Sequence, residues 1–268
     1  MYFAHIFLQI RQSVFTDSFG SKTMILSIGA VVGFLSGLLG KGGSAITTPA
    51  LQIFAGINPF AALASPLPAT LPTTLSASVA YRKENLINKR VVRICILLGI
   101  PITFLGSFFS DLVGGNFLMI LTAVFVLVLG ISFFFITSHP DFETINKIPG
   151  WKIVTVAIVV GFLSGLLANS GGVLFGPLFI RFLKIPIKQA LASSLMVAAG
   201  LAIPGTIAHW YLGHINWHVV LLLSVSSIPF SYFGARVALR LNNVLLERIF
   251  GIMLVVFGAA DLWYNIYR

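Results

Sequence analysis

The chain has 268 residues, of which 57% are hydrophobic and only 9% are charged, and its mean hydropathy is +0.99. A soluble domain carries about 25% charged residues, so this composition excludes an ordinary soluble fold. We expect an all-α polytopic membrane protein whose apolar surface faces lipid. The net charge of +10 indicates topology, since Lys and Arg collect in cytoplasmic loops. It does not indicate nucleic-acid binding, because no segment resembles a soluble domain that could carry a basic patch.

Residues 1–23 are expected to form a separate N-terminal amphipathic segment. Apolar residues recur here at helical spacing, with polar residues between them. This pattern is typical of a helix that lies on the membrane surface. The apolar positions are Phe3, Ile6, Phe7, Ile10 and Val14.

The rest of the chain contains two copies of one unit. Residues 33–39 read GFLSGLL, and the same run returns at 161–167, an offset of 128 positions. The offset also relates, without a gap, Pro49 and Pro177, the ALAS runs at 62–65 and 190–193, Pro101 and Pro229, and Gly106 and Gly234. We therefore predict a first transmembrane repeat at 24–137, an inter-repeat loop at 138–150 and a second transmembrane repeat at 151–268.

Each repeat contains five apolar runs in the same order. The first two runs of each repeat are shorter than the about 20 residues that a full span needs. We interpret them as broken or re-entrant half-helices that meet near the membrane midplane. The runs lie at 24–39, 44–56, 58–80, 91–110 and 114–137 in the first repeat, and at 151–167, 172–183, 187–210, 217–236 and 243–264 in the second.

Equivalent loops of the two repeats carry opposite charge bias. The loop at 82–93 holds five Lys and Arg residues, whereas its counterpart at 210–221 holds none. Two further pairs differ in the same way: basic 181–188 from uncharged 53–60, and 236–248, with three Arg, from 108–120. Because Lys and Arg mark the cytoplasmic side, equivalent loops are expected on opposite sides of the membrane. The sequence therefore predicts two inverted-topology repeats whose basic loops face the cytoplasm.

A glycine-rich break follows the first run of each repeat, at 40–44 and 168–172. Backbone that leaves helical geometry at membrane depth is tolerated only inside the protein or beside a wet cavity. The helix that restarts after each break directs free N–H groups and a partial positive charge toward it, which favours an anion. The predicted substrate-binding residues here are Lys41, Gly42, Gly43 and Ser44 in the first break and Asn169, Ser170, Gly171 and Gly172 in the second.

Lys41 supports the prediction of an anion. An ionisable residue between two apolar half-helices costs on the order of 3 kcal/mol, so it needs a partner. No Asp or Glu lies nearby in the sequence, and a substrate anion is a candidate partner. The alternative is that Lys41 extends to the membrane surface from a shallower loop.

Small residues elsewhere have a simpler interpretation. Gly33 and Gly37, and likewise Gly161 and Gly165, are four positions apart on one helix face. Such spacing lets two membrane helices approach closely. We therefore expect these glycines to be helix-packing positions.

A second polar cluster lies in the third run, with Ser65 in the first repeat and Ser193 and Ser194 in the second. These hydroxyls either line the substrate path or bond back to the preceding helical turn. Thr and Ser residues at 70–78 make the same face polar, which favours a path lining. Helix breaks are expected at Pro66, Pro68 and Pro72 in the first repeat and at Gly200, Pro204 and Gly205 in the second.

The sequence does not indicate catalysis. All seven acidic residues lie outside the predicted membrane centres, so we expect no carboxylate proton relay of the kind that pumps use. His209 is interpreted as a satisfied interfacial histidine, and Cys95 as a packing residue. Nothing resembles a catalytic triad, a zinc site or a nucleotide loop, so we expect no enzyme activity, no cofactor and no metal.

The doubled motif resembles the sulfite exporter TauE/SafE family of membrane anion transporters. The resemblance rests on GFLSGLLGKGGSAITTPAL at 33–51 and GFLSGLLANSGGVLFGPLF at 161–179, and on the ALASPL, ALASSL and GHINW runs. It implies a secondary transporter of small sulfur-containing anions such as sulfite, thiosulfate or organosulfonates, in the inner (plasma) membrane of the cell. The sequence departs from the family pattern at Lys41, Ser44 and the pair 169–170.

Two other functions stay open from the sequence alone. An anion-selective channel would need polar faces along the full length of a pore, and an intramembrane enzyme would need a catalytic constellation. The expected partners are a small anionic substrate and the lipid bilayer, with no nucleic acid. A homodimer is also left open.

Overall fold

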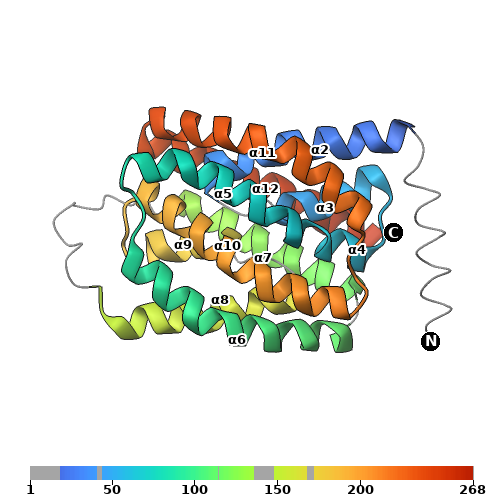
Figure 1. Ribbon diagram of the computed structural model, residues 1–268, viewed down its shortest axis with the longest axis horizontal. Helices are drawn as coiled ribbons and strands as arrows, with labels where there is room; N and C mark the ends of the chain where they lie inside the picture. Colours follow the sequence, from blue (N-terminus) through green and yellow to red (C-terminus); the bar gives the residue numbers. More distant parts are fainter. Residues whose placement is uncertain (1–18, 41–43, 114, 136–147, 168–171, 268) are drawn as a thin grey trace.

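The computed structural model describes residues 19–40, 44–113, 115–135, 148–167 and 172–267. These residues form a layered bundle of helices joined by short connections, and no strand occurs among them (Figure 1). Most of the predicted N-terminal amphipathic segment lies outside the described residues. The first described helix begins, and the last one ends, at the same end of the bundle (Figure 1).

The helices follow the predicted apolar runs. Five of them, α2, α6, α10, α11 and α12, are long and apolar enough to cross a membrane. The prediction of an all-α polytopic membrane fold is therefore confirmed. The bounds are α2 (Phe19–Leu39), α3 (Ser44–Ala55), α4 (Pro59–Ala64), α5 (Pro66–Lys83), α6 (Lys89–Val113), α7 (Gly115–Phe135), α8 (Gly150–Leu166), α9 (Gly172–Arg181), α10 (Ile187–Tyr211), α11 (Trp217–Arg240) and α12 (Asn243–Tyr267).

The expectation that the first run of each repeat is short was wrong for α2 and is confirmed for α8, which has 17 residues. Helix α2 has 21 residues, about 31 Å at 1.5 Å per residue, which is enough for a full span. Its polar start stays helical because hydroxyls bond back to the helix: Thr23 donates to the Gly20 carbonyl and Ser27 to the Thr23 carbonyl. The second run of each repeat, α3 with 12 residues and α9 with 10, has about half the length of a full span.

Proline has different effects on the third run of the two repeats. In the first repeat the run divides at Ser65 into α4 and α5, with Pro66 as the first residue of α5. In the second repeat Ser194 stands at the position equivalent to Pro66, and α10 continues through it without interruption. Helix α10 also passes through Pro204, so the break expected there was wrong.

The closest helix contacts join one repeat to the other. Helix α2 packs along α11, and α8, its equivalent at offset 128, packs along α6, the equivalent of α11. A Cβ atom on Gly33 would lie 2.6 Å from the Cα of Ser227, and one on Gly161 would lie 3.1 Å from the Cα of Gly99. These two contacts also differ by 128 positions. The glycines of the GFLSGLL runs are thus helix-packing positions, as predicted.

Candidate functional site

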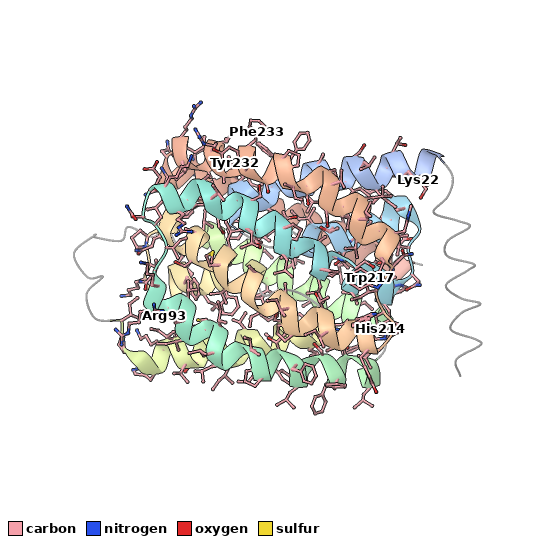
Figure 2. The ribbon with its side chains drawn as sticks, viewed as in Figure 1. Lys22, Arg93, His214, Trp217, Tyr232 and Phe233 are labelled. Carbon is pink, nitrogen blue, oxygen red and sulfur yellow. The ribbon has the colours of Figure 1, made fainter. Side chains whose placement is uncertain are left out.

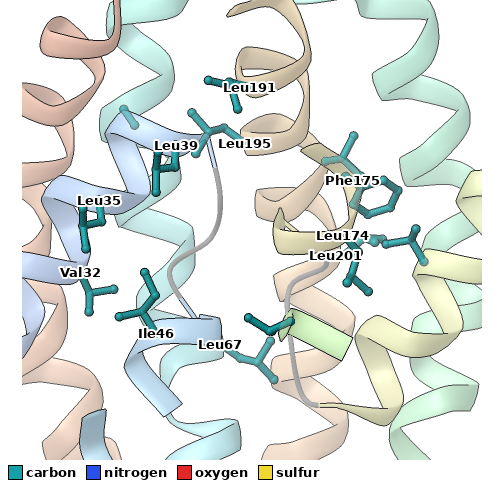
Figure 3. Packing of buried hydrophobic residues seen from close by; sticks show 14 of the residues in the cluster. Val32, Leu35, Leu39, Ile46, Leu67, Leu174, Phe175, Leu191, Leu195 and Leu201 are labelled. Atoms are coloured by element: carbon teal, nitrogen blue, oxygen red, sulfur yellow. The ribbon is translucent and has the colours of Figure 1, made fainter. Parts of the chain in front are cut away.

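The described residues that flank the two helix breaks belong to the apolar core of the bundle. Figure 3 shows Val32, Leu35 and Leu39 of α2 and Ile46 of α3 beside one break. Leu174 and Phe175 of α9 lie beside the other, and both are buried. Residues 41–43 and 168–171 lie outside the described part of the chain. The ligand roles of Lys41, Gly42, Gly43, Asn169, Ser170 and Gly171 therefore stay predictions.

The half-helices begin where the sequence predicts. Helix α3 starts at Ser44 and α9 at Gly172, positions that differ by the repeat offset of 128. The first N–H groups of a helix have no partner within the helix. Each half-helix therefore presents donors and a partial positive charge at its break, inside apolar surroundings.

Ser194 holds the first break against α10. Gly40, just after α2, has a φ of +63°, a left-handed conformation that glycine adopts without strain. The Ser194 hydroxyl donates to the Gly40 carbonyl and lies 2.9 Å from the Leu191 carbonyl oxygen. The Ser194 hydroxyl thus hydrogen bonds to protein carbonyls, one beside the first break and one in its own helix. Direct contact of Ser194 with a substrate stays a prediction.

Ser65 and Ser193 connect the repeats through their loops. The Ser65 hydroxyl accepts a hydrogen bond of 2.9 Å from the backbone N–H of Asn216. The Ser193 hydroxyl accepts one of the same length from the backbone N–H of Asn88. Both serines are fully buried. Their observed role is to fix the loops before α11 and α6, and a wall-lining role stays a prediction.

A small cavity bordered by hydroxyl groups lies between α2, α3, α5 and α11. Its volume is about 20 Å³, room for about one water molecule. A substrate oxyanion needs more space than this cavity provides in the described conformation. Its polar residues are Thr47, Thr70, Thr73 and Ser227, and its other lining residues are Gly29, Val32, Pro66, Ala69 and Leu223.

Some hydroxyl groups of the polar face at 70–78 bond back to their own helix, and one also reaches another helix. Thr70 and Thr74 donate to the carbonyls of Pro66 and Thr70, four residues earlier, which is the back-bonding alternative. Thr73 also reaches across the bundle, with its Oγ1 2.5 Å from the Oγ of Ser227. Sequence reasoning found the threonines of α5 but missed Thr47 and Ser227. The hydroxyls at 47–48, soon after the break, were the available signal for the first of these.

Tyr81 and His209 stabilise the helix ends that precede the breaks. The last carbonyls of a helix have no partner within it. The Tyr81 hydroxyl donates to the Gly37 carbonyl over 3.0 Å, and the Nε2 of His209 lies 3.4 Å from the Gly165 carbonyl oxygen. The two contacts differ by 128 positions. His209 is buried, as expected for a satisfied histidine, whereas Tyr81 was missed because tyrosine is unremarkable near a helix end.

His209 also contacts a second histidine. Its Nδ1 lies 3.0 Å from the Nδ1 of His214, whose ring stacks on Phe60 with a centroid distance of 4.4 Å. Within the described ranges no group of three His, Cys, Asp or Glu residues is arranged to hold a metal ion. The side chains of Asp111 and Asp261 lie outside the described structure.

Comparison with known proteins gives a consistent result over nearly the whole chain. The family model described as Sulfite exporter TauE/SafE matches residues 25–260. A probable membrane transporter protein of Bacillus subtilis, YunE, is 23% identical across 92% of this chain and 99% of its own length. A probable membrane transporter protein of Xylella fastidiosa is 27% identical across 90% of this chain and 96% of its own length. No solved structure matches the chain significantly.

Proposed function

Because the chain belongs to the sulfite exporter TauE/SafE family, we propose that it is a secondary transporter of small sulfur-containing anions such as sulfite, thiosulfate or organosulfonates. The family and the relatives, which are named as probable membrane transporters, make the chain a multi-pass membrane transporter. The substrate class, the carrier mechanism and a position in the inner (plasma) membrane are the proposal.

The paired half-helices carry the proposal of an anionic substrate. Helices α3 and α9 both begin after a break, at equivalent positions of the two repeats. The residues around their starts, such as Ile46 and Leu174, are buried and apolar. In a medium of low dielectric constant, two helix N-termini stabilise negative charge more strongly than they do in water. Lys41, in the first break, would add a full positive charge.

An inverted arrangement of the two repeats would favour a carrier mechanism. In Figure 1, α2 begins at the right-hand end of the bundle and its equivalent, α8, begins at the left-hand end. Rocking of one repeat against the other around a fixed site is the usual mode of transport in such proteins. The cavity beside Thr47 and Ser227, with a volume of about 20 Å³, is too small for an oxyanion, which fits a carrier better than an open channel.

Counterflow in proteoliposomes tests the proposal. Vesicles loaded with unlabelled sulfite should accumulate labelled sulfite transiently against its gradient if the protein is a carrier. A channel would let the label equilibrate without this overshoot. Thiosulfate, an organosulfonate and a plain carboxylate, each loaded inside in turn, would define the substrate class. If only the carboxylate produces an overshoot, the sulfur-anion assignment is wrong although the carrier mechanism holds.

A further inference from the structure

A cavity with a basic lining lies at the end of the bundle where α5 and α11 finish and α10 begins. Its volume is about 510 Å³. This is enough for the polar head of a lipid, and ligand pockets in proteins generally have about 300–1,000 Å³. The lining consists of four basic residues, Lys83, Lys188, Arg236 and Arg240, together with Glu84, Ala80, Leu86 and Leu239.

The charges converge from three separate helices. Lys83 is the last residue of α5, Lys188 lies in the first turn of α10, and the two arginines lie near the end of α11. Four positive charges against the one carboxylate of Glu84 leave the lining with a formal charge of +3. The tendency of Lys and Arg to gather on one side of the membrane explains why each of these helix ends is basic. It does not explain why all three meet around one cavity.

Two of the cations are held in place by other groups. The Nζ of Lys188 donates to the Leu239 carbonyl over 2.9 Å, which connects the first turn of α10 to the end of α11. The Nε and Nη2 of Arg236 donate to the Tyr232 hydroxyl over 3.1 and 2.7 Å, and the guanidinium lies 5.2 Å from the centre of the tyrosine ring. A guanidinium has five N–H donors, so Arg236 keeps donors for an oxyanion.

The α11 face next to these cations is apolar and exposed. Phe233 lies three positions before Arg236 and Val237 directly after it, and both are exposed. Figure 2 shows Tyr232 and Phe233 at the outer edge of the bundle. A ligand in the cavity would thus have a charged head beside the arginines and an apolar surface continuing along α11. This combination fits an amphiphile better than a free ion.

The equivalent positions at the other end of the bundle have no charge. Lys188 and Lys83 correspond to Phe60 and Tyr211 at offset 128, and Arg236 and Arg240 correspond to Phe108 and Leu112. The repeat fold therefore does not require cations at these positions. Of the two equivalent sets of positions, only the one that lines the cavity is charged, which favours a ligand on that side.

From these observations we propose that the cavity binds the phosphate head of an anionic phospholipid, with the acyl chains lying along Phe233 and Val237 of α11. Basic pockets between membrane helices on the cytoplasmic side recognise such head groups through Lys and Arg. The site is separate from the helix breaks and does not depend on the transported substrate.

Titration of the purified full chain in phosphatidylcholine nanodiscs with phosphatidylglycerol tests the site, with bound lipid counted by native mass spectrometry. Each positive charge contributes about five-fold to affinity for an anionic lipid, so the double substitution R236Q/R240Q should weaken binding about 25-fold. The matched control R82Q/R90Q removes two exposed charges from a basic loop at the same end, outside the cavity. It should change affinity less than two-fold.

Three results would overturn the assignment. Equal losses in the two double variants would mean that diffuse surface charge binds the lipid. Binding of millimolar inorganic phosphate in the absence of anionic lipid would mean that the cavity binds a free oxyanion. Unchanged lipid binding in R236Q/R240Q would remove the cavity from consideration. If that variant unfolds in phosphatidylcholine, Lys83→Gln alone gives the same comparison against Arg82→Gln, with an expected five-fold loss.

Discussion

The hydroxyl of Ser65 accepts a hydrogen bond of 2.9 Å from the backbone N–H of Asn216. Shifting each residue by 128 positions gives Ser193 and Asn88, which make the same bond at the same length. Each repeat thus supplies a buried serine that fixes a loop of the other repeat. The relationship makes the repeats interdependent in a way that hydropathy alone does not indicate.

Substituting either serine should therefore destabilise the protein to a similar extent. Ser65→Ala or Ser193→Ala leaves a partly buried backbone N–H without its acceptor, which costs about 1–3 kcal/mol. Thermal unfolding in detergent or nanodiscs measures the loss. Ser78→Ala is the control, because that hydroxyl only bonds back to the Thr74 carbonyl in its own helix. Wild-type stability in both test variants would contradict this account of the loop contacts.

The contact between α2 and α11 should not tolerate a methyl group. In Gly33→Ala the new Cβ would lie 2.6 Å from the Cα of Ser227, so the two backbones must separate. The expected cost is about 1–3 kcal/mol, typical of overpacking. Gly205→Ala is the control, since a Cβ there meets only the ends of flexible side chains at 3.5 Å or more. Equal stability of the two variants, measured by thermal unfolding, would show that the helices do not pack so closely.

Tyr81 should matter through its hydroxyl alone. Tyr81→Phe keeps the ring but removes the donor to the Gly37 carbonyl, which lies in the last turn of α2 and has few other partners. We expect lower thermal stability and faster hydrogen exchange at the end of α2. Tyr211→Phe, at an exposed position, should change neither. If Tyr81→Phe matches the wild type in exchange, the hydroxyl does not stabilise the helix end.

Inverted topology predicts opposite exposure of equivalent loop positions. Asn88 and Asn216 cap α6 and α11 through their side chains, so the neighbouring residues Lys89 and Trp217 are better probes. Both are exposed and differ by 128 positions. A single cysteine at 89 should react with an impermeant reagent only from the cytoplasmic side, and one at 217 only from outside. Labelling of both from one side would disprove the inverted arrangement.

Much of the fold was predictable because membrane helices are long, continuous apolar runs. The apolar runs located α3 and α9 to within a few residues, and identical runs at 33–39 and 161–167 revealed the duplication. The prediction failed where polar residues satisfy themselves within a helix. The start of α2 was missed because its first turns are polar, and Thr23 bonds back to the Gly20 carbonyl there. A separate failure is Pro204, which stays inside α10.

The site was only partly predictable, since its groups come from distant segments. The break glycines are visible in the sequence because they interrupt apolar runs. The pairing of Thr73 with Ser227, 154 positions apart, is not. Likewise the roles of Ser65 and Ser193 depend on loops of the opposite repeat, which only the packed structure brings within hydrogen-bond distance.

The central claim is that the helix breaks bind the transported anion. Transport of labelled sulfite by Lys41→Ala in proteoliposomes tests this claim most directly. A charge-assisted hydrogen bond is worth enough that its loss should weaken apparent affinity about ten- to a hundred-fold. Lys152→Ala, a lysine outside the breaks, should transport like the wild type. Wild-type affinity and rate in Lys41→Ala would contradict the account, because the lysine would then extend to the membrane surface and the anion would bind elsewhere.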